Sequence, residues 1–261
     1  MQVRRVATAV LASLLLVSGC GGDDESTATT QTTASPATTA TTASAGGLPQ
    51  GGDPVELDPA NFVKVIDNPM WPLRRGSRWV YRETHPDGAT SRIVMTVTDR
   101  TKTVLRIEAT VVRDVLTEDG KVKEDTFDWY AQDKDGNVWY LGEDTKEYEG
   151  GKVVSTKGSW EAGVDGAQAG VIMPAQPEPG MTYRQEYYEG EAEDQAEVLR
   201  LDEHVEVPFG MFDGALQTKE TTPLEPDVVE HKYYARGIGL VLAVGVSGGS
   251  KREELIEFRK P

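Results

Sequence analysis

The sequence predicts a mainly β, antiparallel fold with little helix, and three observations support this. Short runs rich in Val, Ile, Thr, Trp and Tyr are separated by turn sequences such as His85-Pro86-Asp87-Gly88 and Glu118-Asp119-Gly120, a spacing typical of all-β chains. Apolar and polar residues alternate over Arg92–Thr98 and Leu105–Val111, which predicts strands with one buried face. No long stretch has the helical period. A curved sheet, a sandwich or a barrel would satisfy this pattern.

The first element is a targeting segment. Arg4 and Arg5 precede an apolar run from Val6 to Val17, and small residues and Cys20 follow it. This order is typical of a secretory signal, and the run is shorter than the roughly 20 residues that a membrane span needs. Val17-Ser18-Gly19-Cys20 resembles the bacterial lipobox. The resemblance implies that residues 1–19 are removed and that Cys20 carries a diacylglyceryl group, often with acylation, such as palmitate, of the new amine. Two or more acyl chains would anchor the chain stably to the extracytoplasmic face of the cell membrane.

Residues 20–52 are predicted to form a disordered tether after the signal. The segment is dominated by Thr, Ala, Ser and Gly, and Leu48 is its only large aliphatic residue, so it has too little apolar surface to offset the entropy of ordering. A flexible coil of about 30 residues spans roughly 30 Å. Its composition resembles mucin-like stalks that carry O-linked sugars, and the layout of anchor and tether resembles actinobacterial lipoproteins.

Residues 53–261 are predicted to form the β domain. Asp58 and Pro59 favour a short helix over Pro59–Val65, and strands are expected at Arg78–Glu83, Val104–Val115 and Val122–Gln132. A shift of 104 residues aligns the possible halves 53–157 and 158–261. It superimposes three sets of residues: Gly76 and Trp79 on Gly180 and Tyr183; Val94, Met95 and Val97 on Val198, Leu199 and Leu201; and Trp129-Tyr130-Ala131 on Tyr233-Tyr234-Ala235. Duplication and chance similarity between strands both explain these matches.

Two segments of the domain carry a second resemblance. Pro72-Leu73-x-x-Gly76-x-x-Trp79-x-Tyr81 and Tyr234–Val241 resemble the opening and closing strands of uncharacterised, β-rich bacterial lipoprotein domains. Such domains are sometimes compared with lipoprotein-carrier half-barrels, which bind acyl chains on a concave sheet. The resemblance implies an envelope location and a β architecture, and it implies no activity.

Composition excludes several classes of function. The 261 residues include 43 acidic and 27 basic ones, for a net charge of −16, so a general surface for nucleic acid or anionic lipid is not expected. The single cysteine excludes a disulfide framework or a multi-cysteine metal site. There is no nucleotide-binding glycine loop, nucleophile elbow or His-x-x-x-His pair. We therefore expect no cofactor and no metal, and the oligomeric state stays open.

Polar candidates each have a simpler interpretation. Asp133–Asn137 begins like a calcium loop, but positions six and twelve are Val138 and Asp144, so a hairpin turn is favoured. His204 and His231 could form a metal or proton-relay pair, or they could be exposed strand residues. The many carboxylates could include a catalytic pair, or they could form a solvated surface.

Aromatic residues are the candidate ligand-binding set. Successive strand residues point to opposite faces, so one of Trp129 and Tyr130, and one of Trp139 and Tyr140, could face outward. Together with Trp160 these residues could form a platform for sugar rings or apolar ligands, or they could pack across strands. Trp160 lies in Gly158–Gly180, the longest predicted loop, which is either a packed connector or a lid.

The sequence therefore predicts a membrane-anchored extracytoplasmic protein of unknown ligand that is not an enzyme. A binding module for an apolar or sugar-containing envelope component would need a concave apolar pocket with exposed Trp or Tyr. The alternative, an accessory or structural subunit that binds another protein, would need an exposed apolar patch or an open sheet edge. A carboxylate-dependent hydrolase, the least favoured interpretation, would need opposed carboxylates in a cleft.

Overall fold

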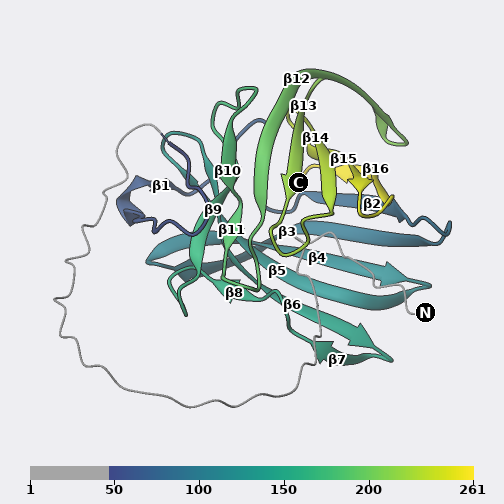
Figure 1. Ribbon diagram of the computed structural model, residues 1–261, viewed down its shortest axis with the longest axis horizontal. Coiled ribbons are helices and arrows are strands. Elements are labelled where there is room, and N and C mark those ends of the chain that lie inside the picture. The colour runs from purple at the N-terminus through teal and green to yellow at the C-terminus, as the bar shows by residue number, and fades with distance from the viewer. Residues whose placement is uncertain (1–46) are drawn as a thin grey trace, which may run out of the picture.

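A computed structural model describes residues 47–261, and β-strands are almost the only regular secondary structure in this part of the chain (Figure 1). Within that range there is no α-helix, and one 3-10 turn, η1 (Pro59–Asn61), is capped by Asp58, whose side chain accepts a hydrogen bond from the backbone N–H of Ala60. The strands are β1 (Phe62–Val63), β2 (Arg78–Thr84), β3 (Thr90–Val104), β4 (Ile107–Glu118), β5 (Lys121–Asp133), β6 (Val138–Glu149), β7 (Lys152–Ser155), β8 (Trp160–Glu161), β9 (Gln168–Met173), β10 (Thr182–Arg184), β11 (Glu186–Tyr187), β12 (Gln195–Val207), β13 (Gly210–Thr221), β14 (Val229–Ala235), β15 (Gly239–Ser247) and β16 (Arg252–Arg259).

The strands form one antiparallel, strongly curved sheet. Its main path runs β10-β12-β13-β14-β15-β16-β2-β3-β4-β5-β6-β9-β11. Its two ends meet in one short segment, because β10 pairs with β12 while β11, one residue further along the chain, pairs with β9. The sheet is therefore nearly closed and barrel-like, and the predicted mainly β, antiparallel fold class is confirmed.

The two halves of the sequence follow similar paths in this sheet. Shifted by 104 residues, β2 falls on β10 and β11 together, and β3, β4, β5 and β6 fall approximately on β12, β13, β14 and β15. Gly76 and Gly180 both have positive φ, 84° and 86°, and each donates its N–H to a valine carbonyl of a long strand of its half, Val97 on β3 at 2.9 Å and Val198 on β12 at 2.8 Å. A positive φ is available to glycine without strain. The same backbone device thus opens both halves.

Trp71 lies between two tyrosines that correspond under this offset. Its ring is 6.1 Å from the ring of Tyr130 and 5.8 Å from the ring of Tyr234, edge-on in both cases, an arrangement that aromatic pairs favour. The division into halves at residue 157 stays a prediction. In the sheet, β9, which follows that boundary, pairs with β6, which precedes it.

The predicted strand Val104–Val115 is interrupted in the structure. Leu105 and Arg106 have φ values of 48° and 65° and form a tight turn between β3 and β4. Such turns normally contain Asn or Gly, so no turn was predicted at Leu105 and Arg106. Leu105 contacts Gly163, where an added Cβ would lie 2.4 Å from the Leu105 side chain. Tertiary packing therefore helps to hold a turn that local propensity does not favour.

The predicted loop Gly158–Gly180 contains two strands, β8 and β9, both paired with β6. Trp160, Val171 and Met173 are buried, and Val164 is exposed. This part of the chain is integrated into the sheet, as the connector interpretation expects.

The last residues of the predicted tether contact the domain, and the predicted boundary at residue 53 stays a prediction. Pro49 is buried, and its carbonyl accepts the backbone N–H of Arg184 at 2.7 Å. The Arg184 guanidinium donates to the carbonyls of Gly51 and Asp53, both at 2.7 Å. The end of the predicted tether is thus fastened to β10. The predicted signal peptide 1–19, Cys20 and the rest of the tether lie outside the described residues.

Candidate functional site

The predicted aromatic site lies mostly inside the protein. Trp129, Tyr130, Tyr140 and Trp160 are buried, and Trp139 is half-buried. Tyr140 stacks on Tyr130 at 4.8 Å and meets Trp160 edge-on at 5.3 Å. The indole N–H of Trp139 donates to Asp133 at 2.8 Å. Ligand binding by these rings stays a prediction, and it would require the core to open.

Trp129 and Tyr130 are neighbours, yet both are buried, because Lys102 and the backbone of Gly142, beside which β8 pairs with β6, lie against the ring of Trp129. A Cβ on Gly142 would lie 2.3 Å from the Trp160 carbonyl and 2.9 Å from the Trp129 ring, so β8 and that ring both approach the glycine closely. The ammonium group of Lys102 lies 3.8 Å from the centre of the Trp129 ring, a favourable cation–π contact. We expected either Trp129 or Tyr130 to face solvent because we assumed that the outer face of the sheet is solvent-exposed. At this position it is not, and both rings are buried.

Carboxyl groups form a polar cluster in the interior of the first half. The Tyr140 hydroxyl lies 2.7 Å from Asp128 and 2.9 Å from Glu143. A hydroxyl has one proton to donate, so both contacts are hydrogen bonds only if one carboxyl is protonated. Burial raises the pKa of Asp128 to about 7, and burial together with the charge of Asp128 raises the pKa of Glu143.

A second polar cluster lies in the other half. The Lys232 ammonium is 2.6 Å from Glu220 and 3.6 Å from Glu230, and the Tyr234 hydroxyl donates to Glu220 at 3.0 Å. Burial alone would lower the pKa of Lys232, but these carboxylates outweigh it and raise that pKa. Lys232 therefore stays charged and neutralises part of the cluster.

Glu186 and Asp194 lie between the two clusters, where the ends of the sheet meet. Trp160 donates its indole N–H to Glu186 at 2.8 Å. The other oxygen of Glu186 and one oxygen of Asp194 are buried without a hydrogen-bond partner. Burial, reinforced by the charge of Asp194, raises the pKa of Glu186. Burial also raises the pKa of Asp194 to about 8.

These interior carboxyls do not form the open site that a hydrolase needs. They are almost completely buried, so substrate could not reach them without unfolding part of the sheet. Within residues 47–261 no group of three or more His, Cys, Asp or Glu side chains is arranged to hold a metal ion. His204 pairs with Asp213 and His231 with Gln217, so these histidines have separate partners.

The Asp133–Asn137 segment is a hairpin turn, as its sequence suggests. One carboxylate oxygen of Asp133 accepts the backbone N–H groups of Gly136 and Asn137, both at 2.8 Å. The carboxylate is used within the turn and within its contact to Trp139.

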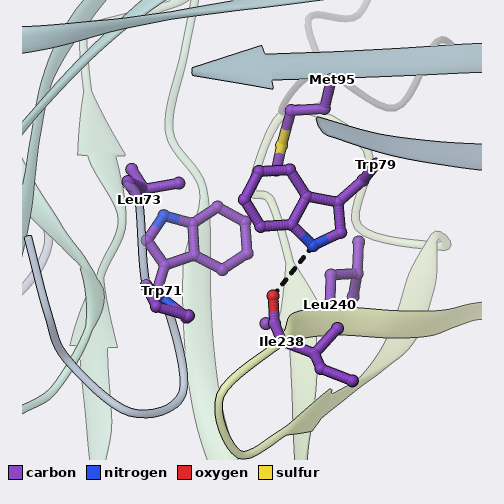
Figure 2. Close-up of a pocket in the computed structure, with 8 residues that line it drawn as sticks. Trp71, Leu73, Trp79, Met95, Ile238 and Leu240 are labelled. Atoms are coloured by element: carbon purple, nitrogen blue, oxygen red, sulfur yellow. Dashed lines mark hydrogen bonds between the residues drawn. The ribbon is translucent and has the colours of Figure 1, made fainter. Parts of the chain in front are cut away.

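The two segments that resemble bacterial lipoprotein domains meet at a small apolar crevice (Figure 2). Trp79 donates its indole N–H to the carbonyl of Ile238 at 2.9 Å, and the Tyr81 hydroxyl donates to the carbonyl of Leu240 at 3.1 Å. Trp71 and Met95 complete the wall, and the space between the side chains has no room for a water molecule. The side chains around this crevice therefore pack the segment Pro72–Tyr81 against the segment Tyr234–Val241.

A hairpin formed by residues 200–215 extends beyond the sheet, and we call it the arm. Pairing of β13 with β14 begins only at Leu216, and pairing of β12 with β10 ends at Glu197. Between Val198 and Val205 the β12–β13 register shifts three times, and Gly214 has a φ of 69°. Such irregularities bend a strand pair. The arm arches over β14, β15 and β16 (Figure 1).

The inner face of the arm is fastened to the body. Val205 and Val207 are buried. The N–H of Phe209 donates to the Leu255 carbonyl at 3.1 Å, and its ring lies 6.4 Å from the ring of Phe258. These contacts hold the arm in one position against the sheet.

Pro208–Phe212, which we call the arm tip, exposes large apolar side chains. Met211 is 69% exposed and Phe209 39%, and the rings of Phe209 and Phe212 stack at 6.4 Å. Pro208 and Gly210 are common turn residues, whereas Phe209 and Met211 are not, and clustered exposed apolar residues mark interaction sites. Sequence analysis missed this site, although an apolar run within a hairpin turn was a visible signal.

The edge strand β7 is a weaker candidate. Within the part of the chain that the structure covers it pairs only with β6, and it exposes Val153 and Val154. It is only four residues long and begins with Lys152. Short edge strands with lysine are a common protection against unwanted strand pairing, so this edge has an explanation without a partner.

Comparisons with known proteins define no family for this chain. No family model and no curated protein matches it. A protein from Bacteroides fragilis, described as exported and with a YMCC-like fold, has 16% identity and a TM-score of 0.42, over 73% of this chain and 99% of that one. A protein from Parabacteroides distasonis described as a lipoprotein has 12% identity and a TM-score of 0.36, over 74% of this chain and 99% of that one. Similarity at this level supports no inference about function.

Proposed function

We propose that this chain is a lipid-anchored accessory protein of the cell envelope whose β domain binds another protein through the arm tip. The observation that carries the proposal is the side chain of Met211 on the outer face of the arm tip, which at 69% is more exposed than any other large apolar side chain of residues 47–261. Aromatic residues and Met at the centre of an accessible patch are typical of the residues that dominate binding between proteins.

The arm tip favours a protein partner over a small ligand. A binding module for an apolar or sugar-containing component would need a concave pocket lined by accessible rings. In the described residues the candidate rings are packed in the core, and the crevice beside Trp79 is filled. A flat or convex apolar patch matches the surface of a partner protein, which is the need of an accessory subunit.

The anchor is argued from the sequence. Arg4-Arg5, the apolar run to Val17 and Cys20 favour export, cleavage and acylation at the extracytoplasmic face. No helix within residues 47–261 is long and apolar enough to cross a membrane. The lipid on Cys20 would then supply membrane attachment, with the β domain held at the end of the tether.

Site-specific photo-crosslinking tests the proposal. A photoreactive phenylalanine analogue replaces Met211 in the full-length protein, made in its source cells. The matched control carries the same analogue at Val153, which is 47% exposed on β7. We expect a discrete protein adduct from position 211 and none of that mass from position 153. Identical adduct patterns from both positions would refute a role for the arm tip.

A further inference from the structure

The residues around the arm tip carry a strongly unbalanced charge. The arm contains four carboxylates and one Arg, without any Lys. Arg200 pairs with Glu203 at 2.9 Å, so its charge is partly used within the arm. The net charge of the arm is therefore negative. Its carboxylates are Asp202, Glu203, Glu206 and Asp213.

The carboxylates nearest the tip share a face with Met211. Glu206 lies directly opposite Met211 in the β12–β13 register, and cross-strand neighbours project to the same side of a strand pair. Asp213, two residues beyond Met211, is exposed and lies 2.6 Å from His204. The outer face of the arm thus presents an apolar side chain with acidic neighbours, while the inner face with Val205 and Val207 packs on the body.

We propose that the arm tip inserts into an apolar pocket of a protein partner whose rim carries lysine or arginine side chains. This inference rests on the proposed function and specifies the partner. Charges at the rim of an interface steer encounter and fix orientation, and the acidic neighbours of Met211 would meet complementary charges only on a basic rim. The apolar tip would supply the buried centre of the contact.

Two other occupants fit this charge pattern less well. An anionic bilayer would repel the carboxylates that surround Met211. A second copy of the chain docking arm to arm would bring Glu206 and Asp213 close to the same carboxylates of its partner. Like charges across an interface are destabilising. Both occupants remain distinguishable outcomes of the experiment below.

The arm can present its tip without rearrangement. Its inner face holds it through the contacts of Phe209 with Leu255 and Phe258, and Met211 stays on the opposite face. The register shifts and the positive φ of Gly214 set the bend. A partner could therefore engage the arm in the position that the structure shows.

The test extends the crosslinking experiment to isolated membranes, where ionic strength can be varied. The photoreactive analogue stays at position 211, and the arm is either unchanged or carries Glu206→Gln with Asp213→Asn. The control carries Glu56→Gln with Glu108→Gln, which are exposed acids at the N-terminal end of the domain and on β4. All four substituted side chains are exposed, so the fold should be preserved, and unfolding midpoints verify this.

We expect the arm with Glu206→Gln and Asp213→Asn to give about 2- to 30-fold less crosslinked product at low salt. This range follows from the loss of two exposed charge pairs with the partner at about 0.2–1 kcal/mol each. The control should match the unchanged arm. Raising KCl from about 50 to 500 mM should lower the yield of the unchanged arm, because salt screens exposed charges, and should affect the neutralised arm less.

The outcomes separate the two proposals. If a protein adduct forms at position 211 but its yield changes neither with the Glu206→Gln and Asp213→Asn substitutions nor with salt, the inference of a basic rim is wrong and the proposed function is unaffected. An adduct with lipid, or with the mass of two copies of this chain, overturns both proposals. A pattern from position 211 identical to that from Val153 overturns the proposed function and the inference with it.

Discussion

Replacing Trp79 by alanine should strongly destabilise the domain. Trp79 is 1% exposed, its indole N–H donates to the Ile238 carbonyl at 2.9 Å, and its ring lies 5.0 Å from that of Phe258. Removing a buried tryptophan ring costs about 3–5 kcal/mol, and leaving the carbonyl without its donor costs about 1–3 kcal/mol more. We expect a loss of about 4–8 kcal/mol, which is a large part of the stability of a typical domain.

Urea unfolding followed by circular dichroism measures this loss. Trp79→Phe serves as the matched variant, because it keeps an aromatic ring beside Phe258 and removes only the N–H and part of the ring. Its cost should be about 1–3 kcal/mol, close to that of the missing hydrogen bond. If Trp79→Ala changed the unfolding free energy by less than about 1 kcal/mol, the ring could not be a core element, and the packing of the two motif segments would be misassigned.

Three further predictions concern pH, the anchor and a close backbone contact. Burial raises the pKa values of Asp128 to about 7 and of Glu124 and Asp194 to about 8, so above about pH 4 the folded state binds more protons than the unfolded state. Stability should therefore fall by about 2 kcal/mol for each of these groups between pH 5.5 and 7.5 in calorimetry, and an equal or higher melting temperature at pH 7.5 would contradict the burial of these groups. Cys20→Ser should move the protein from the membrane fraction to the soluble extracytoplasmic fraction, and membrane retention would show that the anchor is misassigned. Gly142→Ala should cost about 1–3 kcal/mol by overpacking because the new Cβ would lie 2.3 Å from the Trp160 carbonyl, whereas Gly249→Ala has nothing within 4 Å and should be neutral in the same unfolding assay.

The sequence predicted those features of the fold that depend on local chemistry. Turns such as His85–Gly88 and the Asp58 cap of η1 form as expected, because Asp and Gly have conformational preferences that act over a few residues. The helix predicted over Pro59–Val65 is only the 3-10 turn Pro59–Asn61, because Phe62 and Val63 pair with β5 as strand β1. The offset of 104 residues also has a structural counterpart in Gly76 and Gly180, whose positive φ values open both halves.

Features that depend on tertiary contacts could not be predicted from the sequence. The turn at Leu105 and Arg106 lacks turn-forming residues and is supported by contact with Gly163. The burial of both Trp129 and Tyr130 depends on contacts with other strands, such as that of Lys102 on β3 with the Trp129 ring. Alternation identifies a strand, but it does not reveal that side chains from neighbouring strands cover an aromatic ring on the strand's outer face.

The interior carboxyls were beyond sequence analysis for a different reason. With 43 acidic residues, those at positions 128, 143, 186 and 194 do not stand out from exposed carboxylates, since the pattern on the strands is the same. Only the approach of Tyr140 and Trp160 shows that they are inside, and their partners come from distant strands.

The exposed apolar residues of the arm tip, in contrast, could have been predicted, because they lie next to one another in the sequence. In Val207-Pro208-Phe209-Gly210-Met211 the turn residues should be polar if solvent alone shaped the site. The inner side of the arm shows how the protein otherwise treats apolar residues, since Val205 and Val207 are buried against the body. Met211 lies on the outer face because it alternates along β13 with Phe212, which is half-buried. An apolar side chain on the solvent side of a strand pair, next to Glu206, has no role in the packing of this domain, and contact with another molecule is the explanation that crosslinking from position 211 tests.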